Sequence, residues 1–204
     1  RHQFVQIING NIIINSKIVA TFGGVPQGSV IGPLLFLIFI NDVADYIKLK
    51  SKDVISSLYQ LLLFADDVLL ILSNKNLKDL EVDSYILINL FDQWCSLNLL
   101  NMNVIKTSFM LCNHRLTANL SFNIFVDTIE IDRVNTIKYL GLMMDNNLTF
   151  ELQVENICKK LYSSLFVVKS LARFCEASLL ISVYHALIMS HITYCITVWS
   201  FCNN

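Results

Sequence analysis

The sequence predicts an α+β fold, on three observations. Short runs of apolar and β-branched residues are interleaved with segments in which apolar residues recur every three or four positions. An apolar share of 54% over 204 residues is enough to build a core without disulfides. From residue 149 onward the pattern is helical, so a helical piece follows the mixed part.

The charge composition excludes several classes of protein. Charged residues make up 15% of the chain, against roughly 25% in an average globular domain. A disordered charged tail and a Gly/Ser-rich linker are therefore excluded. Fifteen basic and 16 acidic residues give a net charge of −1, so the chain has no bulk attraction to nucleic acid. A nucleic-acid partner has to be argued from a site.

The six cysteines show no pattern of a metal site or a disulfide framework. They form no C-x-x-C pair, and Cys112 with His114 lacks the second pair that a zinc site needs. Six free thiols without a recognisable secretory signal are typical of a reducing, intracellular compartment, with nucleus and cytoplasm both open.

The N-terminal segment predicts a β-hairpin followed by a glycine-rich loop. A β-rich run at 4–8 and a second at 12–14 flank Asn9-Gly10-Asn11, which tolerates a tight turn. An extended piece at 17–22 then leads into the glycine-rich stretch 23–28, which lacks the spacing of a phosphate-binding loop.

A helix is predicted from Ser29 to about Ile47. Ser29 is a suitable N-cap, and Pro33 falls in the first turn, where its missing N–H does no harm. The body of this segment is apolar all round. A helix of that kind is expected to be buried on every side.

Residues 61–72 contain two strand-length apolar runs broken by a pair of carboxylates. Asp66 and Asp67 are expected at the bend of a tight, buried hairpin. An ionised carboxylate in apolar surroundings is costly unless it is paired, and no Lys or Arg lies within the hairpin. Two explanations stay open: a bend that reaches solvent, or a divalent-cation site, for which Mg²⁺ best suits carboxylate oxygens.

The next segments predict a long helix, short strands and a helical tail. The helix spans about 77–99, with Lys78, Asp79, Asp83 and Asp92 facing away from its apolar stripe. A turn-forming cluster at 145–147 is the expected boundary before the tail, which divides near Phe174. The strand candidates are 109–112, 122–126, 129–131 and 137–143.

Four blocks of residues stand out as sequence motifs. They are Gly24-Val25-Pro26-Gln27-Gly28-Ser29, Phe64-Ala65-Asp66-Asp67, Asn98 to Thr107, and Tyr139-Leu140-Gly141. The third matches an N-x-L-x-x-N-x-x-K-T pattern, and the last continues to Asp145 in a Y-L-G-x-x-x-D pattern. A softer S-H-x-x-Y match ends at Tyr194. Together the four blocks resemble the reverse transcriptase of non-LTR (LINE-type) retrotransposons.

The resemblance implies a partial right-hand polymerase palm, an antiparallel sheet with packed helices, at 1–145 and a helical thumb-like region at 146–204. Asp66 and Asp67 would be the catalytic acids that hold Mg²⁺ in a two-ion site. Leu140 and Gly141 would form a primer-grip-like hairpin. The positions implied to meet the template and nucleotide are Pro26, Gln27, Gly28, Ser29, Phe64, Ala65, Asn103 and Lys106.

The implied partners are an RNA template, a DNA primer and deoxynucleoside triphosphates. Family members carry a further aspartate upstream of the glycine-rich block, but no aspartate precedes Asp42 here, and Gln153 stands where His is usual. A truncated or decaying copy that does not polymerise DNA by itself is therefore expected.

Two alternatives stay open. One is a remnant or binding module that keeps only the fold. In that case Lys106 is an ordinary surface lysine, and Lys159, Lys160, Lys169 and Arg173 form an ordinary polar helical face. The other is a small membrane protein anchored by residues 179–201, whose length is about that of a bilayer span. We expect no membrane partner, because Ser182, His185 and His191 interrupt this stretch.

Overall fold

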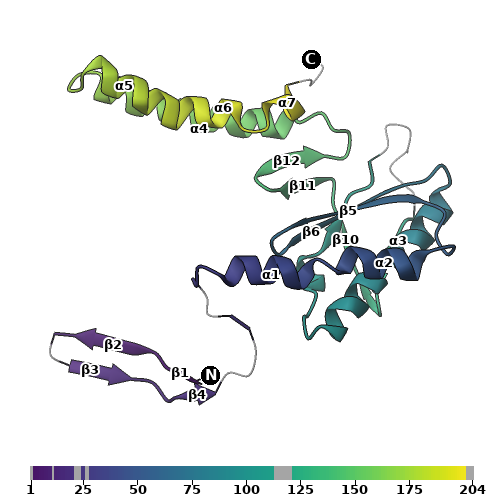
Figure 1. Cartoon of the computed structure of the whole chain (residues 1–204). Helices are drawn as coiled ribbons and strands as arrows, with labels where there is room; N and C mark the ends of the chain where they lie inside the picture. The colour runs from purple at the N-terminus through teal and green to yellow at the C-terminus, as the bar shows by residue number, and fades with distance from the viewer. Residues whose placement is uncertain (1, 11, 21–23, 26–27, 113–120, 201–204) are drawn as a thin grey trace. The chain divides into compact units, whose positions relative to one another are not determined.

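The computed structural model describes residues 2–10, 12–20, 24–25, 28–112 and 121–200 (Figure 1). They form two compact units, residues 1–98 and 99–204. Both units mix helices and strands, which confirms the predicted α+β class. The elements of the first unit are β1 (His2–Gln3), β2 (Gln6–Asn9), β3 (Ile12–Asn15), β4 (Val19–Ala20), α1 (Gly32–Ile40), α2 (Val43–Ser51), β5 (Leu58–Phe64), β6 (Asp67–Ser73) and α3 (Leu77–Leu97).

The N-terminal hairpin forms as predicted. β2 pairs antiparallel with β3 across a turn in which Gly10 has a positive φ of 59°, and β1 pairs antiparallel with β4. The described residues of both strands are exposed, although the runs are rich in isoleucine.

The predicted helix over 29–47 is wrong in two respects. It is two helices, α1 and α2, which part at Asn41 and Asp42, and its N-cap is Ile31, which makes no side-chain cap hydrogen bond. The Ser29 hydroxyl is instead buried without a hydrogen-bond partner among the described residues. Pro33 does lie in the first turn.

The expected burial of this apolar helix is also wrong for α1. Leu34, Leu37 and Ile38 are exposed, the last with 65% of its surface. The last turn of α1 contacts α3, where the Phe39 and Trp94 rings lie 6.1 Å apart. Burial needs a partner surface on each side, and in α1 only the end residues Gly32 and Ile40 are buried.

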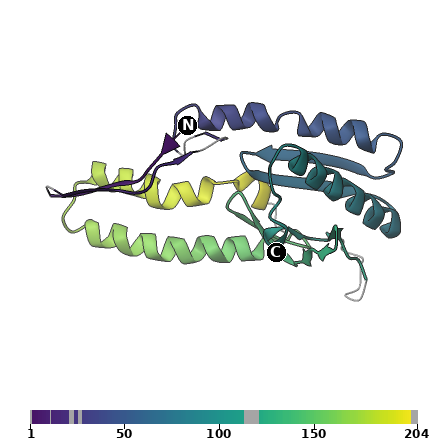
Figure 2. The same cartoon turned by 90° about the horizontal axis from the view of Figure 1, so that it is seen from below.

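The core of the first unit lies where α2 meets α3 (Figure 2). Val43, Ile47, Leu87 and Trp94 are almost completely buried there. The side chains of α3 that face this core recur at the three-to-four spacing predicted for residues 77–99. The same helix also packs on β6, which places the β5–β6 hairpin beside it.

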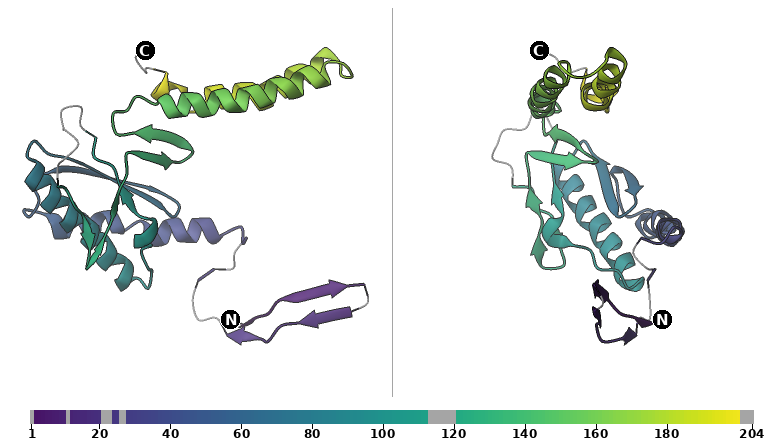
Figure 3. Two further views of the ribbon diagram at one scale, coloured as in Figure 1. Left: turned by 180° about the vertical axis from the view of Figure 1, so that it is seen from behind. Right: turned by 90° about the vertical axis from the view of Figure 1, so that its left-hand side faces the viewer.

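The second unit contains short strands followed by two long antiparallel helical arms. In Figures 1 and 3, α4 runs side by side with the segment α5–α6, in agreement with the contacts between them. Its elements are the 3₁₀ turn η1 (Val104–Lys106), β7 (Ser108–Phe109), β8 (Phe125–Val126), β9 (Ile129–Glu130), β10 (Asp132–Arg133), β11 (Thr136–Tyr139), β12 (Leu142–Asp145), α4 (Glu151–Leu171), α5 (Ala177–Tyr184), the π-helical η2 (His185–Met189), α6 (Ser190–Thr193) and α7 (Ile196–Trp199).

The sheets differ from the single antiparallel sheet that a palm implies. Among the described residues they are six separate two-stranded pairs, of which β7–β10 is parallel. The strand predicted over 137–143 is a hairpin, because Leu140 and Gly141 both have positive φ and turn the chain between β11 and β12. Local turns form such hairpins, whereas one continuous sheet requires edge pairing between segments that are far apart in the sequence.

Candidate active site

The β5–β6 hairpin places the two predicted catalytic acids at its bend. Its strands pair antiparallel in register from Leu58 with Ser73 to Phe64 with Asp67, so the connecting loop is the two residues Ala65 and Asp66. Ala65 has a positive φ of 50°, as the first residue of a two-residue hairpin loop commonly does. Asp66 is therefore in the turn itself, and Asp67 begins β6.

The hairpin has one open face, on which Asp67 lies. Successive residues of a strand point to opposite faces, and paired residues share a face, so Asp67 lies on the same side as Phe64 and Leu62. That side is exposed, with 60% of the Phe64 surface accessible, whereas Tyr59, Leu61 and Leu63 on the other side are half-buried. The tight hairpin is confirmed, but its bend is not buried.

Neither carboxylate has an ion-pair or hydrogen-bond partner among the described residues. Both are exposed and adjacent in sequence. Two hard, unpaired carboxylates fit Mg²⁺, which is usually bound by one or two carboxylates, several waters and the phosphates of a substrate. In the part of the chain that the structure describes, no group of three or more His, Cys, Asp or Glu side chains is placed to hold an ion, so this donor set stays at two.

The opposite end of the hairpin is fixed by Asp83, a residue predicted to face away from the core. Its side chain is only 4% exposed, and its Oδ2 accepts hydrogen bonds from the Ser56 backbone N–H (3.0 Å), the Ser56 hydroxyl (3.0 Å) and the Ser57 N–H (2.7 Å). Asn74, just after β6, donates to both serine hydroxyls. This network joins α3 to the start of β5 and the end of β6.

Hydrogen bonding governs the acidity of Asp83. Burial by itself would raise the pKa of its carboxyl, but the hydrogen bonds from Ser57 and Ser56 outweigh burial and hold the pKa below its ordinary value. The burial of Asp83 could have been predicted from the sequence. Asp83 stands four residues before the buried Leu87 and therefore lies on the same face of the helix.

The glycine-rich block is described only in part. Pro26 and Gln27 lie outside the described residues, so their predicted contacts with template and nucleotide stay predictions. Gly28 has a φ of 82° and therefore a conformation that L side chains rarely adopt, while Ser29 lies three residues before the start of α1.

Asn103 and Lys106 lie in the second unit, at η1. The Asn103 side-chain oxygen accepts a hydrogen bond from the Lys106 backbone N–H (3.3 Å), and its carbonyl accepts one from the Thr107 hydroxyl (2.9 Å). Asn103 thus caps the turn that carries Lys106, whose side chain is exposed. The Asn103 side chain thus contacts the Lys106 backbone, and the relation of both residues to the hairpin bend stays a prediction.

A short clamp joins β12 to α4. The Asp145 carboxylate accepts hydrogen bonds from the backbone N–H groups of Asn147 (3.0 Å), Thr149 (3.0 Å) and Phe150 (2.7 Å) and from the Thr149 hydroxyl (3.1 Å). The buried Gln153 on α4 accepts a hydrogen bond from the Met143 N–H of β12 (3.1 Å). Both residues have a local structural role.

Comparison with known proteins identifies the family. Residues 2–144, more than half of the chain, match the family model "Reverse transcriptase (RNA-dependent DNA polymerase)". This span contains the carboxylate hairpin and the β11–β12 turn. The chain belongs to the reverse transcriptase family.

Three curated relatives come from Drosophila melanogaster mobile elements. The reverse transcriptase chain is 27% identical over 142 residues to the probable RNA-directed DNA polymerase from transposon BS, 27% over 139 residues to that from transposon X-element, and 28% over 148 residues to the RNA-directed DNA polymerase from mobile element jockey. About 70% of this chain is covered in each case, but only 14–16% of the relative. The predicted resemblance to non-LTR retrotransposon polymerases is confirmed.

Two further findings concern solved structures and the membrane-protein alternative. No solved structure matches this reverse transcriptase chain significantly. Within the described residues, none of the helices combines the length and the apolar character needed to cross a membrane.

Replacing Asp145 with alanine in this reverse transcriptase domain is expected to lower the free energy of unfolding by about 2 kcal/mol, because the partly buried donors that it satisfies lose their acceptor. Urea unfolding followed by far-UV circular dichroism measures this change. Asp132→Ala, an exposed strand carboxylate of the same unit, is the matched control and is expected to change stability by less than about 0.5 kcal/mol. Equal effects of the two variants would contradict the clamp.

Proposed function

We propose that the chain is part of an RNA-directed DNA polymerase that extends a DNA primer on an RNA template with deoxynucleoside triphosphates. The observation that carries the proposal is the carboxylate pair inside the family-matched span. Asp66 and Asp67 are adjacent, exposed and unpaired among the described residues, at the bend of a hairpin. Solvent-exposed turns do not need two neighbouring acids, whereas a divalent-cation site uses both.

Within this proposal the carboxylates of Asp66 and Asp67 would hold Mg²⁺. When bound, the ions would supply charge stabilisation to the attacking and leaving oxygens of a phosphoryl transfer. Phe64 lies on the Asp67 face, and its exposed aromatic ring is proposed to contact the primer end. The chain itself contributes the two carboxylates and the aromatic ring of Phe64, all on one hairpin.

The remaining residues of the proposed site bind and orient nucleic acid. Ala65 and the block Pro26, Gln27, Gly28 and Ser29 are proposed to border the template base and the nucleotide, with Gly28 allowing close approach of the backbone. Asn103 positions Lys106 through the η1 cap, and the exposed Lys106 ammonium is then available to a triphosphate. Leu140 and Gly141 are proposed to steady the primer.

The division of the domain follows the same proposal. Residues 1–145 correspond to part of a palm, and 146–204 to a thumb-like region that contacts the duplex backbone. Lys159, Lys160, Lys169 and Arg173 of this region are exposed on or just after α4, and Lys159 also pairs with Glu155 at 3.9 Å. Exposed cations along one helix suit contacts with phosphates.

Binding of a recessed primer tests the proposal. The full 204-residue chain is titrated against a fluorescent DNA primer on a longer RNA template and against a blunt hybrid of the same duplex, with Mg²⁺ present. Tighter binding of the recessed hybrid is expected, because the proposed site contacts the primer end and the template beyond it. A chain that binds neither hybrid would overturn the proposal.

A second candidate is a binding module without catalysis. It is favoured by the small donor set, since among the described residues no third acidic, His or Cys side chain joins Asp66 and Asp67 in a group placed to hold an ion. Equal affinity for the recessed and blunt hybrids, with no extension of the primer, supports this candidate. Extension by the chain alone would refute it, together with our expectation that the 204 residues do not polymerise DNA by themselves.

A further inference from the structure

The β11–β12 turn has a strained backbone. Leu140 has a φ of 46° and Gly141 a φ of 88°, so both loop residues are left-handed. Glycine adopts this conformation freely, but a branched side chain such as that of Leu140 does so at a cost in free energy. Residues held in this way persist only where their surroundings fix them. The contacts of this turn therefore decide its conformation.

One side chain, Tyr194, holds this turn from 54 residues away. Its hydroxyl donates a hydrogen bond to the Leu140 carbonyl. Its ring covers Gly141, where an added Cβ would lie 3.6 Å from the hydroxyl oxygen and 3.7 Å from Cε1. The turn thus receives both a hydrogen bond and a packing surface from the segment after α6.

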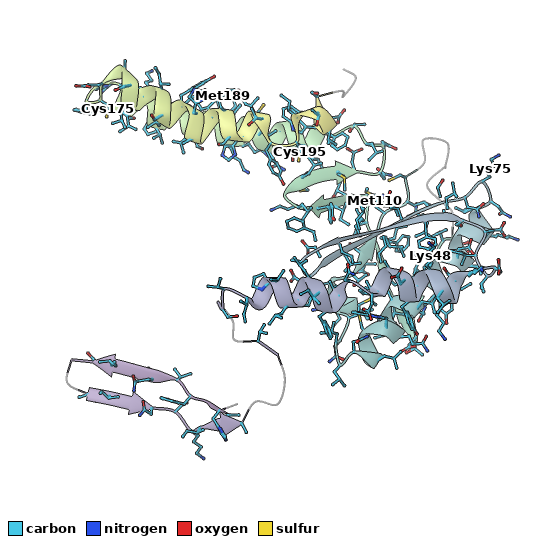
Figure 4. The ribbon with its side chains drawn as sticks, viewed as in Figure 1. Lys48, Lys75, Met110, Cys175, Met189 and Cys195 are labelled. Atoms are coloured by element: carbon cyan, nitrogen blue, oxygen red, sulfur yellow. The ribbon has the colours of Figure 1, made fainter. Side chains whose placement is uncertain are left out.

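Tyr194 is itself held in place. The Trp199 indole Nε1–H of α7 donates to the Tyr194 carbonyl at 2.8 Å. The next residue, Cys195, has a φ of 52° and is the N-cap of α7; it is labelled in Figure 4. Tyr194 keeps 46% of its surface exposed, so the contact buries little apolar area and its main effect is to fix a geometry.

We infer that Tyr194 is a positioning residue, which fixes the Leu140–Gly141 turn so that the turn meets the primer end in one conformation. The inference rests on the proposed function for its last step, because the primer contact of the turn belongs to that proposal. Its physical basis is the hydrogen bond to a carbonyl of a strained turn. Phenylalanine at 194 keeps the ring over Gly141 and removes only that bond.

Two measurements on the full chain test the inference. Hydrogen exchange reports the amides of residues 139–142, and titration reports affinity for the recessed and blunt hybrids. Tyr194→Phe is expected to speed exchange in the turn about fivefold and to weaken binding of the recessed hybrid by a similar factor, with binding of the blunt hybrid and the thermal midpoint unchanged. Tyr184→Phe, which removes the hydroxyl that bonds Met189 Sδ, is the matched control and changes none of these.

The outcomes separate the inference from the proposed function. Unchanged exchange in Tyr194→Phe, or equal losses for recessed and blunt hybrids, overturns the inference while the proposed function stands. Faster exchange in a chain whose wild type binds neither hybrid overturns the primer-positioning role together with the proposed function. Faster exchange with a loss confined to the recessed hybrid supports both.

Discussion

Replacing Asp66 and Asp67 together with asparagine is expected to weaken divalent-cation-dependent binding of a deoxynucleoside triphosphate by at least about tenfold. Asparagine keeps the size of the side chain and an oxygen ligand but removes the negative charge. Mg²⁺ prefers charged carboxylate oxygens, and the described residues show no third acid at the bend to compensate. The fold should be unaffected, because both side chains are exposed and make no described hydrogen bond.

Titration of the nucleotide in the presence of Mn²⁺ measures this loss, and electron paramagnetic resonance counts the bound Mn²⁺. Asp53→Asn is the matched control, since Asp53 is also an exposed aspartate in a positive-φ turn of the first unit. Its nucleotide binding should equal that of the wild type. Nucleotide binding that survives the double replacement, or falls equally with Asp53→Asn, would remove the basis for a metal site at the hairpin bend.

Replacing Asp83 with alanine is expected to lower the free energy of unfolding by about 3 kcal/mol. The substitution leaves the N–H groups of Ser56 and Ser57 without their acceptor, next to a helix that carries the buried Leu87 and Trp94. It also disconnects α3 from the base of the β5–β6 hairpin. Since single domains are stable by only about 5–15 kcal/mol, this is a large fraction of the total.

The effect of Asp83 should depend on pH in one direction. Its pKa is lowered in the folded state, so folding favours the ionised form, and the stabilisation is fully present above the unfolded pKa of about 4. As the pH falls below that value toward the folded pKa, the unfolded state takes up the proton first and the stabilisation is lost. The difference in stability between wild type and Asp83→Ala should therefore shrink below about pH 4.

Urea unfolding at about pH 7 and about pH 3, followed by circular dichroism and by tryptophan emission, checks both statements. Asp79→Ala on the first turn of α3 is the control, since an exposed acid at a helix N-terminus contributes less than about 1 kcal/mol. If Asp83→Ala unfolds at the same urea concentration as the wild type at neutral pH, the network is not stabilising the hairpin.

Local sequence patterns determined the elements that carry the site. The hairpin with Asp66 and Asp67 at its bend follows from two apolar runs and a two-residue break, and α3 follows from its helical period. The N-terminal hairpin follows in the same way from its Asn-Gly turn. These signals act over a few residues, within one element or across one tight turn. They can therefore be read from the sequence without knowing how the rest of the chain folds.

The tertiary structure alone decided which of these elements have partners. Asp83 is buried because Ser56 and Ser57, 27 and 26 residues away, pack against its side of α3, and α1 is exposed because little of the described chain covers it. Tyr194 reaches Leu140 across 54 residues. Periodicity and turn chemistry specify how one segment folds. Contacts between distant segments depend instead on whether their surfaces are complementary in shape and polarity once the chain has folded.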